Sequence, residues 1–170
     1  VIITASHNPG VWNGFKVKER LGNSSPPSVT SAIEAAIPGV IARGCVRRVP
    51  LVAAEASGLI EHLDQRPPFL AALRKLVDIE AIRDAGLHVL ADSMYGAGGG
   101  LTAELLAGGK TQVEELHGAP NPAFPGMHAP EPIARNLGEQ LGRLAAGGFD
   151  VGLSTDGDAD RLGLADEHGM

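Results

Sequence analysis

The chain has 170 residues, 44% of them hydrophobic and 20% charged, which suits a globular protein with one large domain or one domain and part of another. The net charge of −6, with no basic run longer than Arg47-Arg48, argues against nucleic-acid binding. No segment approaches the ~20 apolar residues of a membrane helix, and the lone Cys45 excludes an internal disulfide and fits a reducing cytoplasm.

The chain begins inside an apolar run and without an initiator methionine. Val1-Ile2-Ile3 is typical of the end of a buried strand, and it leads directly into the polar residues 4–9. A second short strand is expected over residues 15–18, after the turn signal Asn13-Gly14. We therefore expect a fragment of a longer protein.

A helix is expected next, after the loop at residues 22–27. Ser28 or Thr30 would cap its start, and Pro38-Gly39 would stop it after Ile37. Residues 47–67 show no clear periodicity, and we place a domain boundary inside this stretch.

From residue 67 onward, helical and strand patterns alternate. Apolar residues at helical spacing predict helices over residues 69–77, 79–82, 101–106 and 133–144. Short apolar runs predict strands over residues 87–91, 111–116, 151–153 and 162–165. Alternating strands and helices imply parallel pairing with right-handed crossovers. The predicted fold class is α/β: the tail of one α/β domain followed by a three-layer α/β/α domain with a mainly parallel sheet. Residues 117–132 form a loop long enough to suggest a functional role.

Residues 156–161 read DGDADR, directly after a predicted strand. Asp156, Asp158 and Asp160 alternate with small residues, so their side chains point the same way in an extended segment. Three neighbouring carboxylates repel one another unless they are solvated or share a cation. Oxygen ligands favour Mg²⁺ or Ca²⁺ over zinc. The carboxyl end of a strand, where open α/β sheets bind ligands, favours a metal site over the alternative of a solvated acidic turn.

A calcium loop of the EF-hand type is a competing interpretation. The three aspartates fall at its first, third and fifth positions, and Glu167 falls at its twelfth. However, the sixth position requires glycine for a sharp turn and here holds Arg161. The predicted flanks are strands instead of helices, so we reject this interpretation.

Residues 4–9 read TASHNP, about 150 residues before the aspartates. Ser6 offers a hydroxyl beside the imidazole of His7. A serine hydrolase is disfavoured, because no G-x-S-x-G elbow is present and adjacent residues seldom place an imidazole on the neighbouring hydroxyl. Alone, the segment also fits a turn closed by an Asx or Ser motif before proline. A hydroxyl that carries phosphate and a cluster of carboxylates need the same cation, so phosphoryl transfer is the leading interpretation.

The glycine-rich residues 96–100 look like part of a dinucleotide-binding fingerprint. Leu101 stands where that pattern requires Gly or Ala, so we assign the run to tight packing between strand and helix. Several histidines are scattered without ligand spacing and are expected on the surface or in loops: His62, His88, His117, His128 and His168.

Taken together, these motifs resemble those of the α-D-phosphohexomutases, the family of phosphoglucomutases and phosphomannomutases. Its serine loop is similar to residues 4–9, and its metal loop is similar to residues 156–161. Residues 13–16, NGFK, and residues 92–98, DSMYGAG, also match family segments. The motifs occur in the family's order over almost the whole chain.

The resemblance implies roles for the polar residues. Ser6 would carry the phosphoryl group, and His7 and Lys16 would be acid/base candidates near the sugar hydroxyl. Arg161 would steady the phosphate or the loops around it. One Mg²⁺ would be held by the phosphate on Ser6 and by three carboxylates: Asp156, Asp158 and Asp160.

The resemblance also implies an isomerase reaction. The family passes phosphate from the serine to a hexose monophosphate, of glucose or mannose, and so makes hexose 1,6-bisphosphate. That intermediate turns around and returns its other phosphate to the serine. The loops of the family that read the sugar and grip the distal phosphate lie outside this chain, so we expect the fragment alone to be inactive and no hexose is singled out.

The expected domains follow from the same resemblance. Residues 1–55 would be the end of the first domain with the phosphoserine loop, residues 56–166 the second domain with the metal loop, and residues 167–170 the start of a third. The alternative is a non-catalytic α/β module that binds a divalent cation and in which Ser6 is only a turn residue. A hexose phosphate is the expected partner; neither nucleic acid nor a membrane is, and the location is expected to be cytoplasmic.

Overall fold

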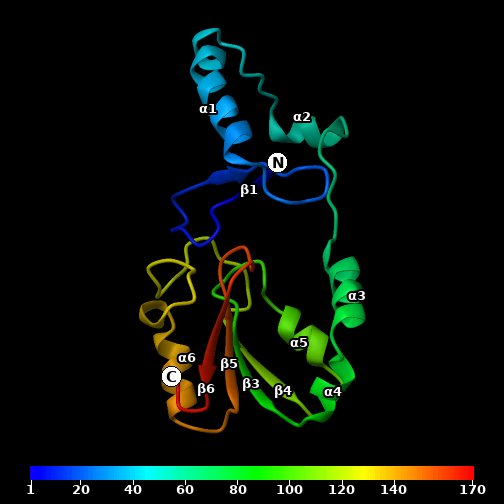
Figure 1. The fold of residues 1–170 in the computed structure, drawn as a ribbon, viewed down its shortest axis with the longest axis vertical. Coiled ribbons are helices and arrows are strands. Elements are labelled where there is room, and N and C mark those ends of the chain that lie inside the picture. The colour runs from blue at the N-terminus through cyan, green and yellow to red at the C-terminus, as the bar shows by residue number, and fades with distance from the viewer. The chain divides into compact units, whose positions relative to one another are not determined.

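The computed structural model describes residues 1–170, which form two compact units (Figure 1). The first unit comprises residues 1–2 and 16–65, and the second comprises residues 3–15 and 66–170. Strands β1 (Ile2–Thr4) and β2 (Gly14–Lys16) pair in a two-stranded sheet, and the loop between them belongs to the second unit. Among the helices, none has the length and apolar character that crossing a membrane requires.

The helices of the first unit are α1 (Pro27–Ala42) and α2 (Leu51–Ala56). Extended Pro26 precedes α1 without a side-chain cap, so the predicted cap by Ser28 or Thr30 is wrong. The predicted end at Ile37 is also wrong, because α1 continues through Pro38. A proline inside a helix removes one backbone hydrogen bond, yet the last turn is still closed by the Arg43 N–H, which donates to the Gly39 carbonyl at 3.3 Å.

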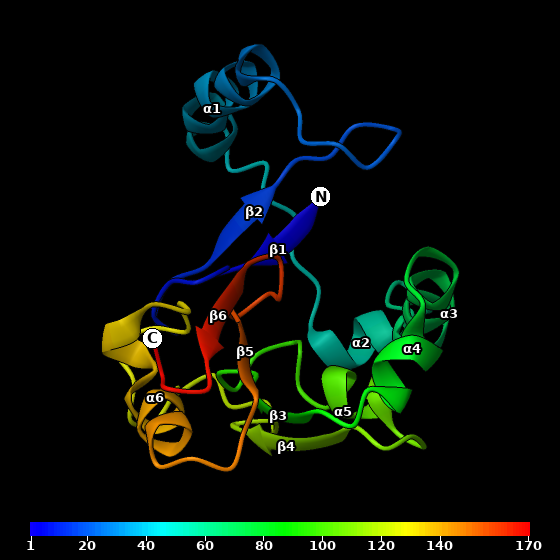
Figure 2. The same ribbon diagram turned by 60° about the horizontal axis from the view of Figure 1, so that its bottom comes forward.

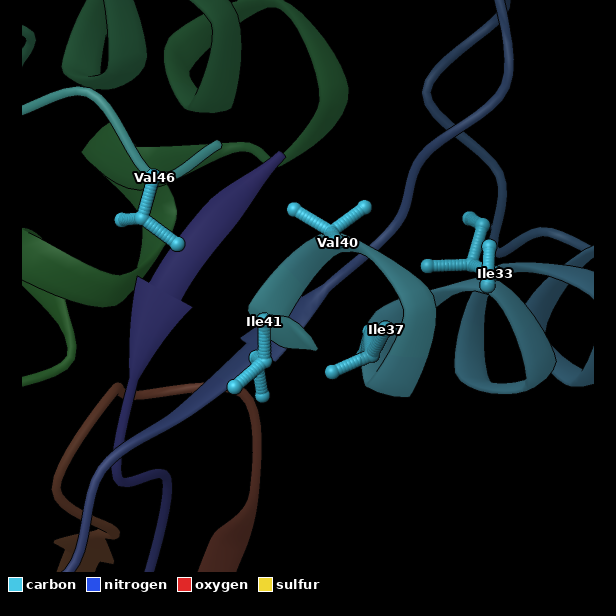
Figure 3. Close-up of a pocket in the computed structure, with 6 residues that line it drawn as sticks. Ile33, Ile37, Val40, Ile41 and Val46 are labelled. Carbon is cyan, nitrogen blue, oxygen red and sulfur yellow. The ribbon is translucent and has the colours of Figure 1, made fainter. Parts of the chain in front are cut away.

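An apolar stripe runs along α1. Figure 3 shows Ile33, Ile37, Val40 and Ile41 on this helix together with Val46 from the segment that follows, and they line a groove of about 400 Å³. No residue of α1 is buried. Apolar residues three and four positions apart form the face that a helix packs against other elements.

The second unit holds a four-stranded sheet in the order β4-β3-β5-β6, with helices on both of its faces (Figures 1 and 2). β3 is parallel to both β4 and β5, whereas β5 and β6 are antiparallel. The predicted α/β class with a mainly parallel sheet is confirmed. The strands are β3 (His88–Asp92), β4 (Gln112–Leu116), β5 (Val151–Thr155) and β6 (Leu162–Asp166). The helices are α3 (Arg66–Leu76), α4 (Ile79–Asp84), α5 (Leu101–Leu106), the 3₁₀ helix η1 (Ala134–Asn136) and α6 (Gly138–Ala145).

Helix α6 covers one face of this sheet, and its Leu144 is fully buried there. Leu144 packs with Leu90, Leu116 and Ala165 in one apolar cluster. Close packing requires glycine at position 152, since a Cβ there would lie 2.6 Å from the Leu144 Cδ1 atom. The helix predicted over residues 133–144 is therefore present with Leu144 on its buried face, but it begins only at Gly138, and Ile133 is exposed outside it.

The opposite face of the sheet packs against α3, α4 and α5. Residues of these helices and of β3 and β5, together with Gly98 and Ala159, line an apolar cavity of about 380 Å³. The turn after β3 and the loops after β4 and β5 all leave the carboxyl edge of the parallel strands. The sequence motifs at residues 92–98 and 156–161 thus lie at one edge of the sheet.

Candidate active site

The aspartate loop, residues 156–161, connects β5 to β6. Both flanks are strands, as predicted, which confirms the rejection of an EF-hand. Ala159 has a positive φ of 60°, an uncommon conformation for a residue with a side chain, and the Ala159 N–H donates to the Asp156 carbonyl at 3.0 Å. The loop therefore turns tightly and brings its side chains together.

Asp156 is fully buried at the base of this loop. Its Oδ1 atom accepts hydrogen bonds from the Asp160 and Arg161 N–H groups, both at 3.0 Å. Its Oδ2 atom has no hydrogen-bond partner, and Arg161 Nε is 4.0 Å away. Burial raises the pKa of Asp156 above its usual value, and the charges of Asp158 and Asp160 raise it further, although the two backbone N–H groups oppose this shift.

The three aspartates meet the requirements of a divalent cation site. Asp156, Asp158 and Asp160 each offer one carboxylate oxygen, and these atoms all lie within 4.8 Å of one another. The buried, unpartnered Oδ2 atom of Asp156 is the kind of oxygen that a cation would satisfy. The donor set consists of oxygens alone, which fits a hard ion such as Mg²⁺.

The serine loop, residues 4–9, is held in a strained conformation. Ser6 has a φ of 54°, which is unusual for a residue other than glycine. Its N–H donates to Thr4 Oγ1 at 2.9 Å. The Asn8 backbone and side-chain N–H groups both donate to the Ala5 carbonyl at 3.0 Å, which closes the turn. Strain of this kind persists only where the surroundings fix it, and it is concentrated at functional sites.

The two loops meet at Asp158, within the second unit. Ser6 Oγ donates to Asp158 Oδ1 at 3.4 Å, and Thr4 Oγ1 donates to Asp158 Oδ2 at 3.1 Å. The backbones also approach closely, because a Cβ on Gly157 would lie 2.3 Å from the Ser6 carbonyl oxygen. The structure therefore brings the predicted hydroxyl next to the predicted metal ligands.

The other predicted residues are placed as follows. His7 Nδ1 lies 3.4 Å from Ser6 Oγ, so the expectation that neighbours would not meet in this way is wrong here. The left-handed backbone at Ser6 turns the two side chains to the same side. Arg161 is half exposed and lies 3.6 Å from Glu131 Oε1. Lys16 is the last residue of β2 and belongs to the first unit, and its role stays a prediction.

Backbone N–H groups of the glycine-rich turn after β3, residues 96–100, donate hydrogen bonds to other parts of the protein. The Ala97 N–H donates to the Gly157 carbonyl at 3.0 Å, and the Gly100 N–H donates to Glu115 Oε1 at 2.7 Å. Gly99 is in close contact with Gly118, where a Cβ would lie 2.0 Å from the carbonyl oxygen. These N–H groups are not free for a pyrophosphate, which agrees with the assignment of this run to packing.

Sequence reasoning missed one buried contact near this edge of the sheet, between Asp92 and His117. Asp92, at the end of β3, is 2% exposed, and its Oδ1 atom lies 2.9 Å from His117 Nδ1. His117 follows β4, a loop position as expected, but its side chain is only 16% exposed. The two residues are 25 apart in sequence, so only the parallel pairing of β3 with β4 reveals their contact.

The fold agrees with the comparisons to known families. Residues 67–169 match the family pattern described as phosphoglucomutase/phosphomannomutase, alpha/beta/alpha domain II, and residues 1–42 match that of domain I. The chain belongs to the phosphoglucomutase/phosphomannomutase family. This confirms the resemblance drawn from the motifs.

Individual relatives give the same result. The chain is 34% identical over 169 residues to a protein of Methanothermobacter thermautotrophicus named "Probable phosphoglucosamine mutase", with 99% of this chain and 35% of that protein covered. It is 32% identical over 168 residues to the "Phosphoglucomutase/phosphomannomutase" of Thermococcus kodakarensis, with the same coverage. A crystal structure from Thermus thermophilus, titled as that of a "putative phosphomannomutase", is 32% identical with a TM-score of 0.79. That match covers 98% of this chain and 36% of the solved one. The chain thus spans about a third of the length of these relatives.

Proposed function

We propose that the protein containing this chain is a phosphohexomutase that moves a phosphoryl group between the 1- and 6-hydroxyls of a hexose, with Ser6 as the phosphoryl carrier. The observation that supports this most directly is the contact of Ser6 Oγ with Asp158 Oδ1 at 3.4 Å. It places a hydroxyl nucleophile at the edge of a three-carboxylate cluster.

Ser6 is suited to accept and release a phosphoryl group. A phosphoserine carries close to two negative charges, and these would face the carboxylates of Asp156, Asp158 and Asp160 directly. The two sets of negative charge are compatible only when a cation lies between them. Mg²⁺ bound at this cluster would neutralise charge on the transferring group.

The bond changes balance without a further reactant. In the forward step the bond from phosphorus to Ser6 Oγ breaks and a bond to a hydroxyl of the hexose monophosphate forms, while a base takes the hydroxyl proton and an acid gives a proton to Ser6 Oγ. The product is a hexose 1,6-bisphosphate. Return of its other phosphoryl group to Ser6 restores the enzyme and leaves the isomeric monophosphate.

We expect the acid and the base of the reaction to be among the residues near Ser6. His7 Nδ1 lies 3.4 Å from Ser6 Oγ, a distance from which the imidazole can hold a proton close to the leaving oxygen. Lys16 is the second candidate, on the basis of the family resemblance. A cation nearby lowers the pKa of a lysine, which is what a lysine base requires.

We propose the class of the sugar substrate and not a particular hexose. Relatives are named for glucosamine, glucose and mannose phosphates, and this chain spans only about a third of their length. A hexose phosphate is therefore the proposed substrate.

The single free cysteine, Cys45, is consistent with a cytoplasmic enzyme.

Activity assays on the full-length protein test this proposal. We expect conversion of glucose, mannose or glucosamine 1-phosphate into the 6-phosphate with Mg²⁺ and none after removal of divalent ions by EDTA. Ser6→Ala should abolish turnover, whereas Ser28→Ala, at an exposed serine of α1, should leave it unchanged. Undiminished turnover in Ser6→Ala would reject the phosphoserine mechanism, whereas an absence of turnover in the wild-type full-length protein would favour a non-catalytic cation-binding module.

A further inference from the structure

A buried hydrogen-bonded pair, Asp92 and His117, lies at the carboxyl ends of β3 and β4. Asp92 is 2% exposed, and its Oδ1 atom accepts a hydrogen bond from the Met94 N–H at 2.9 Å and faces His117 Nδ1 at the same distance. Burying a carboxylate is costly unless it is paired and hydrogen-bonded. The contact with His117 therefore offsets part of the free-energy cost of burying Asp92.

His117 itself is fixed from several sides. The register of β3 and β4 pairs Asp92 with Leu116, which brings the ends of the two strands side by side. The Nε2 atom of His117 lies 3.5 Å from Glu139 Oε2 on α6, so the ring lies between two carboxylates. Its backbone has a φ of 50°, a conformation that needs support from neighbouring contacts.

The turn after β3 depends on this pair. Met94 and Tyr95 have φ values of 47° and 58°, so two successive side-chain-bearing residues are left-handed. Such conformations are uncommon for residues with side chains and persist only where neighbouring contacts support them. The Tyr95 N–H donates to the His117 carbonyl at 2.8 Å, and the Tyr95 and His117 rings lie 4.5 Å apart. Asp92 holds the start of the turn through Met94, and His117 holds its middle through Tyr95.

The same turn holds the aspartate loop. The Ala97 N–H donates to the Gly157 carbonyl at 3.0 Å, and a Cβ on Gly96 would lie 2.6 Å from that oxygen. Gly157 lies between Asp156 and Asp158 in the sequence. On its other side, its N–H donates to the Pro130 carbonyl at 3.0 Å. A shift of the turn would therefore move the peptide that joins two of the three carboxylates.

We infer that His117, together with Asp92, is a positioning residue for the divalent-cation site, acting through the turn at residues 93–97 and the carbonyl of Gly157. The pair touches neither substrate nor cation. It sets the spacing of Asp156 and Asp158 and thereby the cation affinity. This inference rests on the proposed function, because it assumes that the aspartates bind a cation.

Mn²⁺ binding to the full-length protein, measured by electron paramagnetic resonance, tests the inference. His117→Ala should raise the Mn²⁺ dissociation constant about tenfold, in the range seen when groups beyond the direct ligands are removed from metal sites. His117→Asn should restore the affinity to within about threefold, because asparagine tolerates the left-handed backbone and its amide can donate to the same oxygen of Asp92.

A matched control exists at the opposite end of β3. His88 also pairs with a carboxylate, at 3.4 Å from Glu114 Oε1, but is remote from the aspartate loop along the strand. His88→Asn should leave the dissociation constant unchanged. In the metal-free protein, His117→Ala should speed amide hydrogen exchange over residues 156–161 while the central amides of β3 and β4 keep their rates.

The outcomes separate this inference from the proposed function. If Asp156→Asn abolishes Mn²⁺ binding while His117→Ala behaves like His88→Asn in both affinity and exchange, the positioning role is wrong and the metal site stands. If Asp156→Asn leaves binding unchanged, the metal site is wrong and the inference with it. Should His117→Ala not fold, Asp92→Ser takes its place, because a serine hydroxyl can still accept from the Met94 N–H but is one bond too short to keep the contact of Asp92 Oδ1 with His117 Nδ1. An unchanged affinity in a folded Asp92→Ser protein would equally overturn the role.

Discussion

Gly157 is in backbone contact with Ser6, although the two residues are far apart in the sequence. A Cβ placed on Gly157 would lie 2.3 Å from the Ser6 carbonyl oxygen and 2.9 Å from Pro130 Cγ. Only glycine fits at this position. Because glycine allows this contact, the serine loop lies directly against the aspartate loop.

Gly157→Ala is therefore expected to separate the two loops. The methyl group would push Ser6 away from Asp158, and displacements of about 1 Å from a reactive geometry can cost of order 100-fold in rate. We expect a loss of at least about that size in phosphomutase turnover of the full-length protein. Gly142→Ala is the matched control, because nothing lies within 4 Å of its Cβ position on α6. Equal activity of the two variants would show that the contact is not needed.

The raised pKa of Asp156 predicts a pH dependence of stability. Desolvation makes the folded state bind this proton more tightly than the unfolded state does. Between the ordinary aspartate pKa of about 3.9 and the raised folded value, the folded state holds the extra proton. The free energy of unfolding of the metal-free protein should therefore fall as the pH rises through this window.

Urea unfolding in EDTA over roughly pH 4 to 8 measures this effect. The comparison is between wild type and Asp156→Asn, since the carboxyl groups outside the aspartate loop contribute equally to both. The difference in stability should grow in favour of Asp156→Asn as the pH rises, and saturating Mg²⁺ should reverse it by stabilising the wild type. A difference that stays constant with pH would contradict the predicted shift.

The cluster around Leu144 predicts where the second unit is most sensitive to core mutation. Leu144 is fully buried between α6 and the sheet. Leu144→Ala should lower the free energy of unfolding by about 2–5 kcal/mol, as for other large-to-small changes in cores. Leu76→Ala, at a leucine that is 81% exposed, should change it by less than about 0.5 kcal/mol. Similar losses in both variants would argue against this packing.

Much of the fold was predictable because its elements carry strong local signals. β3 is a short apolar run followed by a glycine-rich turn, and β5 leads directly into the aspartates. The end of α1 was not predictable in this way. Pro38 is a helix breaker by local rules, but the hydrogen bond from Arg43 to Gly39 closes the next turn around it.

The sequence predicted which types of residue form the site, but it did not predict all of the contacts between them. Ser6 and Asp158 were linked by the reasoning that a phosphate and a carboxylate cluster share a cation, a property of residue types. The pairing of Asp92 with His117 depends on strand order and register, which no local pattern records. The meeting of His7 with its neighbour Ser6 arises from the positive φ of the serine.

Mass spectrometry of the full-length protein after incubation with a hexose 1,6-bisphosphate and Mg²⁺ tests the central claim most directly. Our account predicts one phosphoryl group on the peptide that contains Ser6, a mark absent from Ser6→Ala and strongly reduced in Asp156→Asn. A wild-type protein that remains unphosphorylated at Ser6 under these conditions, or one that is labelled equally without its aspartates, would contradict it.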